Sequence, residues 1–142
     1  KRKTAEGIFD TYNNTKADSV RPRSVMNRMK KSETGTEALN YLEENRVPVR
    51  LCYGVDNPDG DFGIYDPFED EIIVFCDKTK TIEETAATVV HEARHRMLGS
   101  TNTKAEEIEC YKYELLHLKG ELTQNDIDAI IKHVNKYYPH LP

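Results

Sequence analysis

The stretch that decides the fold is His91-Glu92-Ala93-Arg94-His95, an HExxH pattern inside a segment with helical character. Two histidines four residues apart lie on one face of a helix, so two imidazole nitrogens can reach the same Zn²⁺ ion. The glutamate beside the first histidine can then take a proton from a water at the metal. The pattern therefore predicts a zinc site with His91 and His95 as ligands and Glu92 as general base.

The residues around the pattern favour a helix that packs on a core. Thr81-Ile82-Glu83-Glu84 has the form of a capping box, and Gly99-Ser100 suits a helix end. The apolar positions between them are Ile82, Ala86, Ala87, Val89, Val90, Met97 and Leu98. The alternative interpretation is a surface helix that carries the two histidines and the glutamate by coincidence.

A catalytic zinc site needs a third protein ligand, and a second predicted helix follows the motif. Thr103-Lys104-Ala105-Glu106 is another capping box, which predicts a helix as far as about His117. If the chain reverses near Asn102, a rise of about 1.5 Å per residue brings Glu109 level with His95.

The glutamates of this second helix point in different directions, and this distinguishes the candidates for the third zinc ligand. Glu109 lies at the edge of the predicted apolar stripe, whereas Glu107 and Glu114 are expected to point to solvent. We therefore predict Glu109 as the third ligand and keep Glu106 as the alternative ligand. An ordinary exposed carboxylate is the remaining interpretation of Glu109.

Peptide hydrolysis at such a site usually uses a second electrophile, which stabilises the oxyanion. Tyr113 and His117 lie one and two helical turns beyond Glu109, and they are the candidates in this chain. Packing or surface roles are the commoner fate of such residues.

The order of predicted elements gives an α+β fold. A helix at 34–45 is followed by strands at 47–53, 62–65 and 71–76, by the two helices above, and by a final helix at 123–137. Pro48 near the start of its strand predicts an edge strand. We expect a small antiparallel sheet that leads into the HExxH helix. A substrate peptide could pair with an edge strand there and hold its scissile bond over the zinc.

Charge divides the chain into a basic lead-in and an acidic domain. Residues 1–31 carry a net charge of +6, within a total of −5, so residues 32–142 carry −11. The lead-in is expected to be partly helical, with a short helix over 24–31. The acidic domain argues against nucleic acid as the main partner. No apolar run approaches the ~18 residues of a membrane helix, so no membrane partner is expected.

The cysteines indicate the redox compartment of the protein, and the first residues bear on whether it is part of a longer chain. Cys52, Cys76 and Cys110 are an odd number without CxxC spacing, which argues against a disulfide framework and a zinc knuckle. Buried thiols in a reducing compartment are the favoured interpretation. The chain begins at Lys1 without methionine or a secretory signal, and we expect it to be a piece of a longer protein.

The motif and its second helix resemble the zincin metallopeptidases of the gluzincin kind. Glu107-Ile108-Glu109-Cys110-Tyr111 is similar to the Glu-x-Glu-Ala-Asn/Tyr segment of ImmA/IrrE-type peptidases, and to metallopeptidase domains of bacterial polymorphic toxins. The resemblance covers residues 71–114. It implies a minimal zincin-like domain over 32–142, Zn²⁺ as cofactor and Glu109 as third ligand. Arg94 and Cys110 depart from the pattern, where an uncharged residue and alanine are usual.

These observations predict a zinc-dependent peptidase that acts on a protein or peptide. It would be the toxin or effector module of a larger bacterial protein, secreted or delivered, and active in a reducing cytoplasm. If the domain is such a toxin module, a cognate immunity protein is expected as a further partner. The alternative is a non-catalytic protein-binding domain with a structural or vestigial metal site, and a third candidate is nucleic-acid binding through the lead-in alone.

Overall fold

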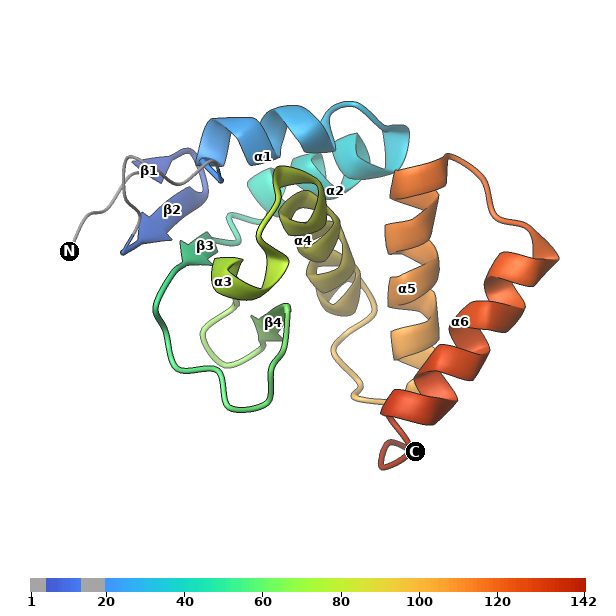
Figure 1. The fold of residues 1–142 in the computed structure, drawn as a ribbon. Helices are drawn as coiled ribbons and strands as arrows, with labels where there is room; N and C mark the ends of the chain where they lie inside the picture. The colour runs from blue at the N-terminus through green and yellow to red at the C-terminus, as the bar shows by residue number, and fades with distance from the viewer. Residues whose placement is uncertain (1–4, 14–19) are drawn as a thin grey trace.

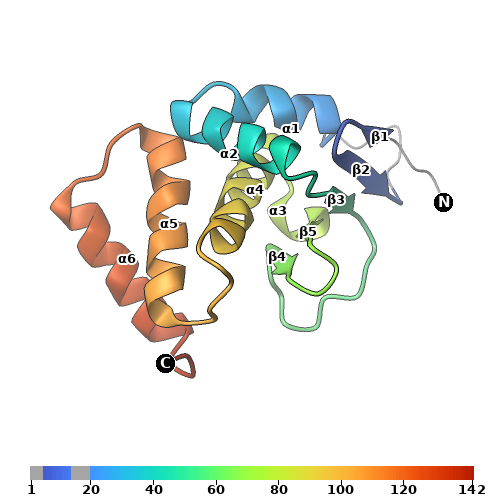
Figure 2. The ribbon, with the colours of Figure 1, turned by 180° about the vertical axis from the view of Figure 1, so that it is seen from behind.

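The computed structural model describes residues 5–13 and 20–142, which form an α+β fold. The strands are β1 (Ala5–Glu6), β2 (Phe9–Tyr12), β3 (Val49–Cys52), β4 (Gly63–Asp66) and β5 (Glu71–Phe75). The helices are α1 (Pro22–Met29), α2 (Glu33–Glu44), α3 (Cys76–Thr79), α4 (Ile82–Met97), α5 (Lys104–Lys119) and α6 (Gln124–Tyr137). Helix α4 lies between the sheet and α5, and α6 packs on α5 from the other side (Figures 1 and 2).

The sheet is mixed, with the strand order β1-β2-β3-β5-β4. Strand β3 is parallel to both β2 and β5, and only the pairs β1–β2 and β4–β5 are antiparallel. The expectation of an antiparallel sheet is therefore wrong for its centre. The loop over 53–62 carries the chain past the place of β5 to the outer edge, so the hairpin returns β5 alongside β3 in parallel.

The expectation that β3 is an edge strand is also wrong, because β3 lies between β2 and β5. Pro48 precedes the first residue of the strand, so the amide that it lacks is not needed in the ladder. Its carbonyl accepts a hydrogen bond from the Ile72 amide, and the Val49 amide donates to the Ile8 carbonyl. The edge of the sheet that lies near α4 is β4.

The basic lead-in contributes to the same sheet and core. Strands β1 and β2 were not predicted, and Phe9 of β2 is fully buried. The predicted short helix is α1, which begins at Pro22, a favoured first helical residue, and buries Val25 and Met29. Residues 1–4 and 14–19 of the lead-in lie outside the described residues.

Helix α4 is the central element of the fold and carries the HExxH motif. The Thr81 side chain accepts a hydrogen bond from the Glu84 amide at 3.1 Å, as its capping pattern predicts. Every residue from Thr85 to Ala93 is buried, because α1, α2, α5 and the sheet all pack on this helix. Gly99 follows the helix at φ 90°, a conformation that glycine adopts without strain. Within the described ranges, no helix is both long and apolar enough to cross a bilayer.

Candidate metal centre

The motif histidines lie on the face of α4 that meets α5. His91 and Glu92 are 6% and 7% exposed, and His95 is partly buried. The two imidazole rings have their centroids 5.1 Å apart. One helical turn thus brings both rings to one place, as the spacing predicts.

Glu107 of α5 joins the two histidines. Its Oε1 lies 3.2 Å from Nε2 of His91, and its Oε2 lies 3.1 Å from Nε2 of His95. The side chain of Glu107 is only 13% exposed. One carboxylate therefore faces the same nitrogen of both rings, at the point where a shared ligand ion would be bound.

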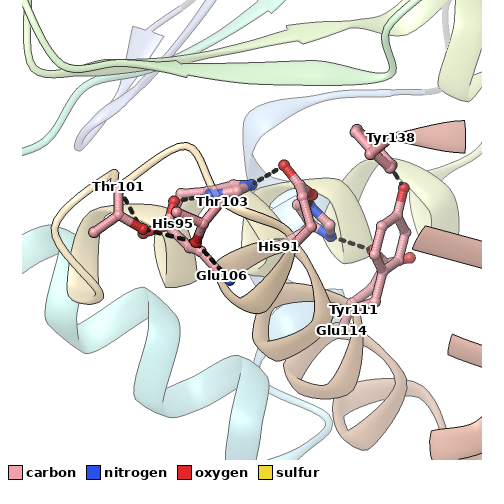
Figure 3. Close-up of polar contacts among 9 residues, drawn as sticks. His91, His95, Thr101, Thr103, Glu106, Tyr111, Glu114 and Tyr138 are labelled. Atoms are coloured by element: carbon pink, nitrogen blue, oxygen red, sulfur yellow. Dashed lines mark hydrogen bonds and ion pairs between the residues drawn. The ribbon is translucent and has the colours of Figure 1, made fainter. Parts of the chain in front are cut away.

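The other nitrogen of each ring has its own carboxylate (Figure 3). Nδ1 of His91 lies 2.8 Å from Oε1 of Glu114, and Nδ1 of His95 lies 2.8 Å from Oε2 of Glu106. Glu106 is fixed in turn by the Thr101 amide, which donates to it at 2.8 Å. Because an ionised carboxylate only accepts hydrogen bonds, each Nδ1 would donate to its own glutamate, and each Nε2 faces Glu107. Metal-binding histidines are commonly oriented by such carboxylates.

The electrostatics of the cluster favour a positive charge between the rings. Burial alone would lower the pKa of His91, but the carboxylates of Glu107 and Glu114 raise it well above its ordinary value. Burial would likewise raise the pKa of Glu107, yet its hydrogen bonds to the two histidines lower it to about 2. A divalent cation would carry the same charge as the two Nε2 protons that it displaced. The donor set therefore fits such an ion.

Cys110 is a further group beside the histidines. One ligand atom each from His91, His95 and Cys110 lies within 4.8 Å of the others, so these three residues could hold a metal ion. The Cys110 thiol is fully buried, and burial followed by the nearby carboxylates of Glu107 and Glu92 raises its pKa. Two ligand sets are thus available around one histidine pair, one completed by Glu107 and one by Cys110.

The structure does not bring Glu109 to the histidines. Its side chain is 45% exposed and forms an ion pair with Lys112 at 3.3 Å. The inference from helix facing is wrong because the buried face of α5 is its polar face. That face consists of Glu106, Cys110, Tyr113 and His117. Of the apolar residues that defined the predicted stripe, Ala105 and Leu118 are exposed, and Ile108, Leu115 and Leu116 are only partly buried.

The two predicted oxyanion stabilisers also lie elsewhere. The Tyr113 hydroxyl donates to Glu37 of α2 at 2.5 Å, and its ring carries the Arg94 guanidinium 5.0 Å from its centroid. This stacking gives Arg94, unusual within the motif, a place against α5. His117 lies 2.5 Å from the Ser32 hydroxyl through Nδ1, and burial lowers its pKa. Both side chains pack against α2 and its start.

A cleft of about 930 Å³ opens beside the motif. Tyr111 of α5 packs edge-on against the His91 ring at 4.5 Å, and its hydroxyl lies 2.9 Å from that of Tyr138 (Figure 3). His133 of α6 also packs edge-on against Tyr111, with the ring centroids 4.9 Å apart. These residues were not among the predicted site residues. The signal that could have found them is the concentration of aromatic residues and histidines at the end of α6.

Comparisons with known protein families, with curated proteins and with solved structures give no match for this chain.

Proposed function

We propose that this protein is a zinc-dependent peptidase in which His91, His95 and Glu107 bind the metal. The observation that carries the proposal is the Glu107 carboxylate, which faces Nε2 of both motif histidines at 3.1–3.2 Å. Two histidines and a carboxylate, with the fourth position open, are a ligand set of catalytic zinc sites. The proposal includes a minimal zincin-like arrangement, with Glu107 in the place that the sequence resemblance gives to Glu109.

Glu107 is preferred to Cys110 as the third ligand on geometry and charge. Both carboxylate oxygens of Glu107 already contact the histidine pair. The Cys110 sulfur lies only within 4.8 Å of a ring nitrogen of each histidine. The thiol would also have to ionise in a setting of carboxylates, which disfavours the thiolate. Glu106 and Glu114 are assigned to orient the rings through Nδ1.

Glu92 is the proposed general base. When bound, zinc supplies Lewis acidity, which brings the pKa of a coordinated water toward ~7 and polarises a carbonyl. Glu92 would accept the proton of the attacking water on its carboxylate and deliver it to the leaving amine. The Glu92 side chain is buried, lines the cleft and has no hydrogen-bond partner among the described residues. Burial raises its pKa, as a proton acceptor working near neutral pH requires.

Strand β4 offers the proposed docking edge for the substrate. It is the last strand of the sheet on the side of α4, so its outer backbone groups can pair with an extended peptide. Gly63 begins β4, and a Cβ there would lie 2.6 Å from Cγ2 of Thr88 and 3.6 Å from Cγ of Glu92. The absence of a side chain at Gly63 lets this edge approach the proposed general base.

Tyr138 and Tyr111 take the role that the sequence analysis gave to Tyr113 and His117. Their linked hydroxyls face the cleft beside His91. Burial raises the pKa of Tyr138, so its hydroxyl stays protonated and able to donate to a developing oxyanion.

The assignment to a toxin or effector module of a larger bacterial protein, with a cognate immunity protein, is carried by the sequence resemblance alone. It extends the peptidase proposal and is independent of the metal-site geometry.

The experiment that tests the proposal is the pair of variants Glu92→Gln and Glu92→Ala. Each should retain stoichiometric zinc by elemental analysis and lose hydrolysis of a quenched fluorescent peptide library. Glu83→Gln, an exposed glutamate on the same helix, is the matched control and should keep both properties. Hydrolysis at the wild-type rate by either Glu92 variant would contradict the proposed role of Glu92 as general base.

The position of Cys110 favours one second candidate, a protein-binding domain with a closed structural site. His91, His95, Glu107 and Cys110 together would supply four protein ligands, and a site closed by four ligands does not catalyse. Cobalt substitution separates the candidates, because a thiolate ligand gives a strong sulfur-to-cobalt charge-transfer band. The band should be absent from the wild-type protein if Glu107 is the third ligand and Cys110 does not bind. A band that disappears in Cys110→Ser would place Cys110 among the ligands, as the closed four-ligand site requires.

A further inference from the structure

The cleft beside the motif has an unusual balance of charge. Its lining includes the acidic side chains Asp59, Asp61, Glu92 and Glu114. Lysine and arginine are absent from the described residues that line it. Four carboxylates exceed the charge of a divalent cation, so the cleft remains anionic when the proposed metal is bound. A ligand that enters it meets a negative field.

Asp59 and Asp61 are exposed side chains that line this cleft. Burial, and then the carboxylates of Asp59 and Glu107, raise the pKa of Asp61. Its backbone is fixed by Asn57, whose side chain accepts from the Asp61 amide and donates to the Asp61 carbonyl. Lys78 is the nearby cation, since its Nζ would lie 4.0 Å from a Cβ on Gly60. Within the described residues, Lys78 forms no salt bridge with Asp59 or Asp61, whose carboxylates remain free for a ligand.

A second observation in the same cleft also points to a ligand. The Glu92 carboxylate is more than nine-tenths buried, lines the cleft and has no partner among the described side chains. Such a group is costly to bury unless a bound molecule completes its interactions. The acidic cluster therefore shares its cleft with a largely buried carboxylate that a bound molecule would contact.

The walls of the cleft are aromatic. Phe62, which follows Asp61, is 45% exposed, and Tyr137 at the end of α6 is 58% exposed. Tyr111 and Tyr138 form the wall between α5 and the chain after α6. Aromatic faces attract cations, and guanidinium groups more often than others. Aromatic walls with carboxylates at their rim suit a long apolar stem that ends in a positive charge.

We propose that this cleft selects peptides with a lysine or arginine beside the scissile bond, with the cation held by Asp59 and Asp61 and its stem on Phe62. The proposal rests on the peptidase function proposed above and names its substrate class. An anionic side chain at the same position would be repelled by the carboxylates, so the discrimination comes from repulsion as well as attraction.

Matched peptides test the selectivity of the zinc-loaded protein. Quenched peptides that differ at one position, with lysine, glutamine or glutamate on each side of the scissile bond in turn, are compared by kcat/KM. We expect lysine to exceed glutamate by about tenfold or more at low salt, and the ratio to fall as salt rises. In Asp59→Asn/Asp61→Asn the ratio should fall toward unity. The control Glu83→Gln/Glu121→Gln makes the same charge change outside the cleft and should keep it.

Binding to the zinc-loaded Glu92→Gln variant separates this inference from the function on which it rests. Fluorescence anisotropy with the same peptides should give the tightest binding for lysine, and a loss of that preference when Asp59→Asn/Asp61→Asn is added. Selective binding without hydrolysis by the wild type would support the cation site and count against the peptidase. Equal binding and equal hydrolysis of the lysine and glutamate peptides would overturn the inference and leave a peptidase without charge selectivity.

Discussion

Glu114 lies 23 residues beyond His91, yet its Oε1 is 2.8 Å from Nδ1 of that histidine. The contact fixes the ring so that Nε2 faces Glu107. We expect Glu114→Gln to leave the fold intact and to weaken zinc binding about 10- to 100-fold, the usual effect of removing such a carboxylate. Competition with a chromophoric chelator measures this affinity. Unchanged affinity would show that Glu114 does not orient the ligand.

Glu107 and Glu109 give opposite predictions although they are two residues apart. Glu107→Ala should remove stoichiometric zinc, because it deletes the carboxylate that both histidines face. Glu109→Ala should keep zinc, because that side chain is exposed and paired only with Lys112 among the described residues. Elemental analysis after dialysis decides between them. Zinc should also raise the Tm of the Glu109 variant and leave that of Glu107→Ala unchanged.

The sequence could predict α4 and its histidine pair because both depend on local rules. A capping threonine, a helical run and a four-residue spacing suffice to place His91 and His95 together. The carboxylate that faces both histidines, that of Glu107, could not be predicted in the same way. The choice of Glu109 assumed that apolar residues define the inner face of α5, and the packing instead buries Glu106 and His117 there. These polar groups are buried on that face because His95 is the partner of Glu106 and Ser32 is the partner of His117.

The helices other than α3, and strands β3, β4 and β5, were predictable for similar reasons, but β1, β2 and the order of the strands in the sheet were not. Thr123 and Asp126 form a reciprocal capping box, so the start of α6 agrees with the prediction. Strand order depends on how the chain crosses the sheet over 20–48 and 53–62, and the local sequence pattern does not determine this crossing. For the same reason, the sequence did not predict that β4 is the edge strand beside Glu92 or that Tyr138 lines the cleft.

Tyr138→Phe removes one hydroxyl from the cleft while keeping the ring. If that hydroxyl donates to the oxyanion, kcat should fall about 10²-fold or more and KM should change little. Tyr113→Phe is the matched control, since its hydroxyl donates to Glu37, away from the cleft. A Tyr138→Phe variant with wild-type kcat would exclude this role, and an equal loss in both variants would indicate a general structural effect.

The three thiols should be unreactive in the native protein. Cys76 and Cys110 are buried, and burial together with Asp10 raises the pKa of Cys52 to about 11. At pH 8 little thiolate is present, so thiol–disulfide reagents should titrate fewer than one cysteine quickly without denaturant. All three should react at once in guanidinium chloride. A fast native thiol would contradict the burial, and Cys52→Ser would show whether it is Cys52.

Asp70 and Arg96 make stability depend on acid pH in a defined direction. Arg96 donates to both Asp70 oxygens, at 2.7 and 3.1 Å, and the Tyr65 hydroxyl donates to one of them. The Arg96 hydrogen bond lowers the pKa of Asp70 below its usual value. A lowered folded-state pKa stabilises the protein above the unfolded-state pKa of ~3.9, and this contribution is lost as the pH falls through the folded-state value.

Because Asp70 is 44% exposed, we expect Asp70→Asn to lower the free energy of unfolding by only about 1 kcal/mol at pH 7. The gap from wild type should narrow below pH 4 in urea unfolding, with Glu121→Gln as the exposed control; a gap of the same size at pH 3 and pH 7 would contradict the ion pair.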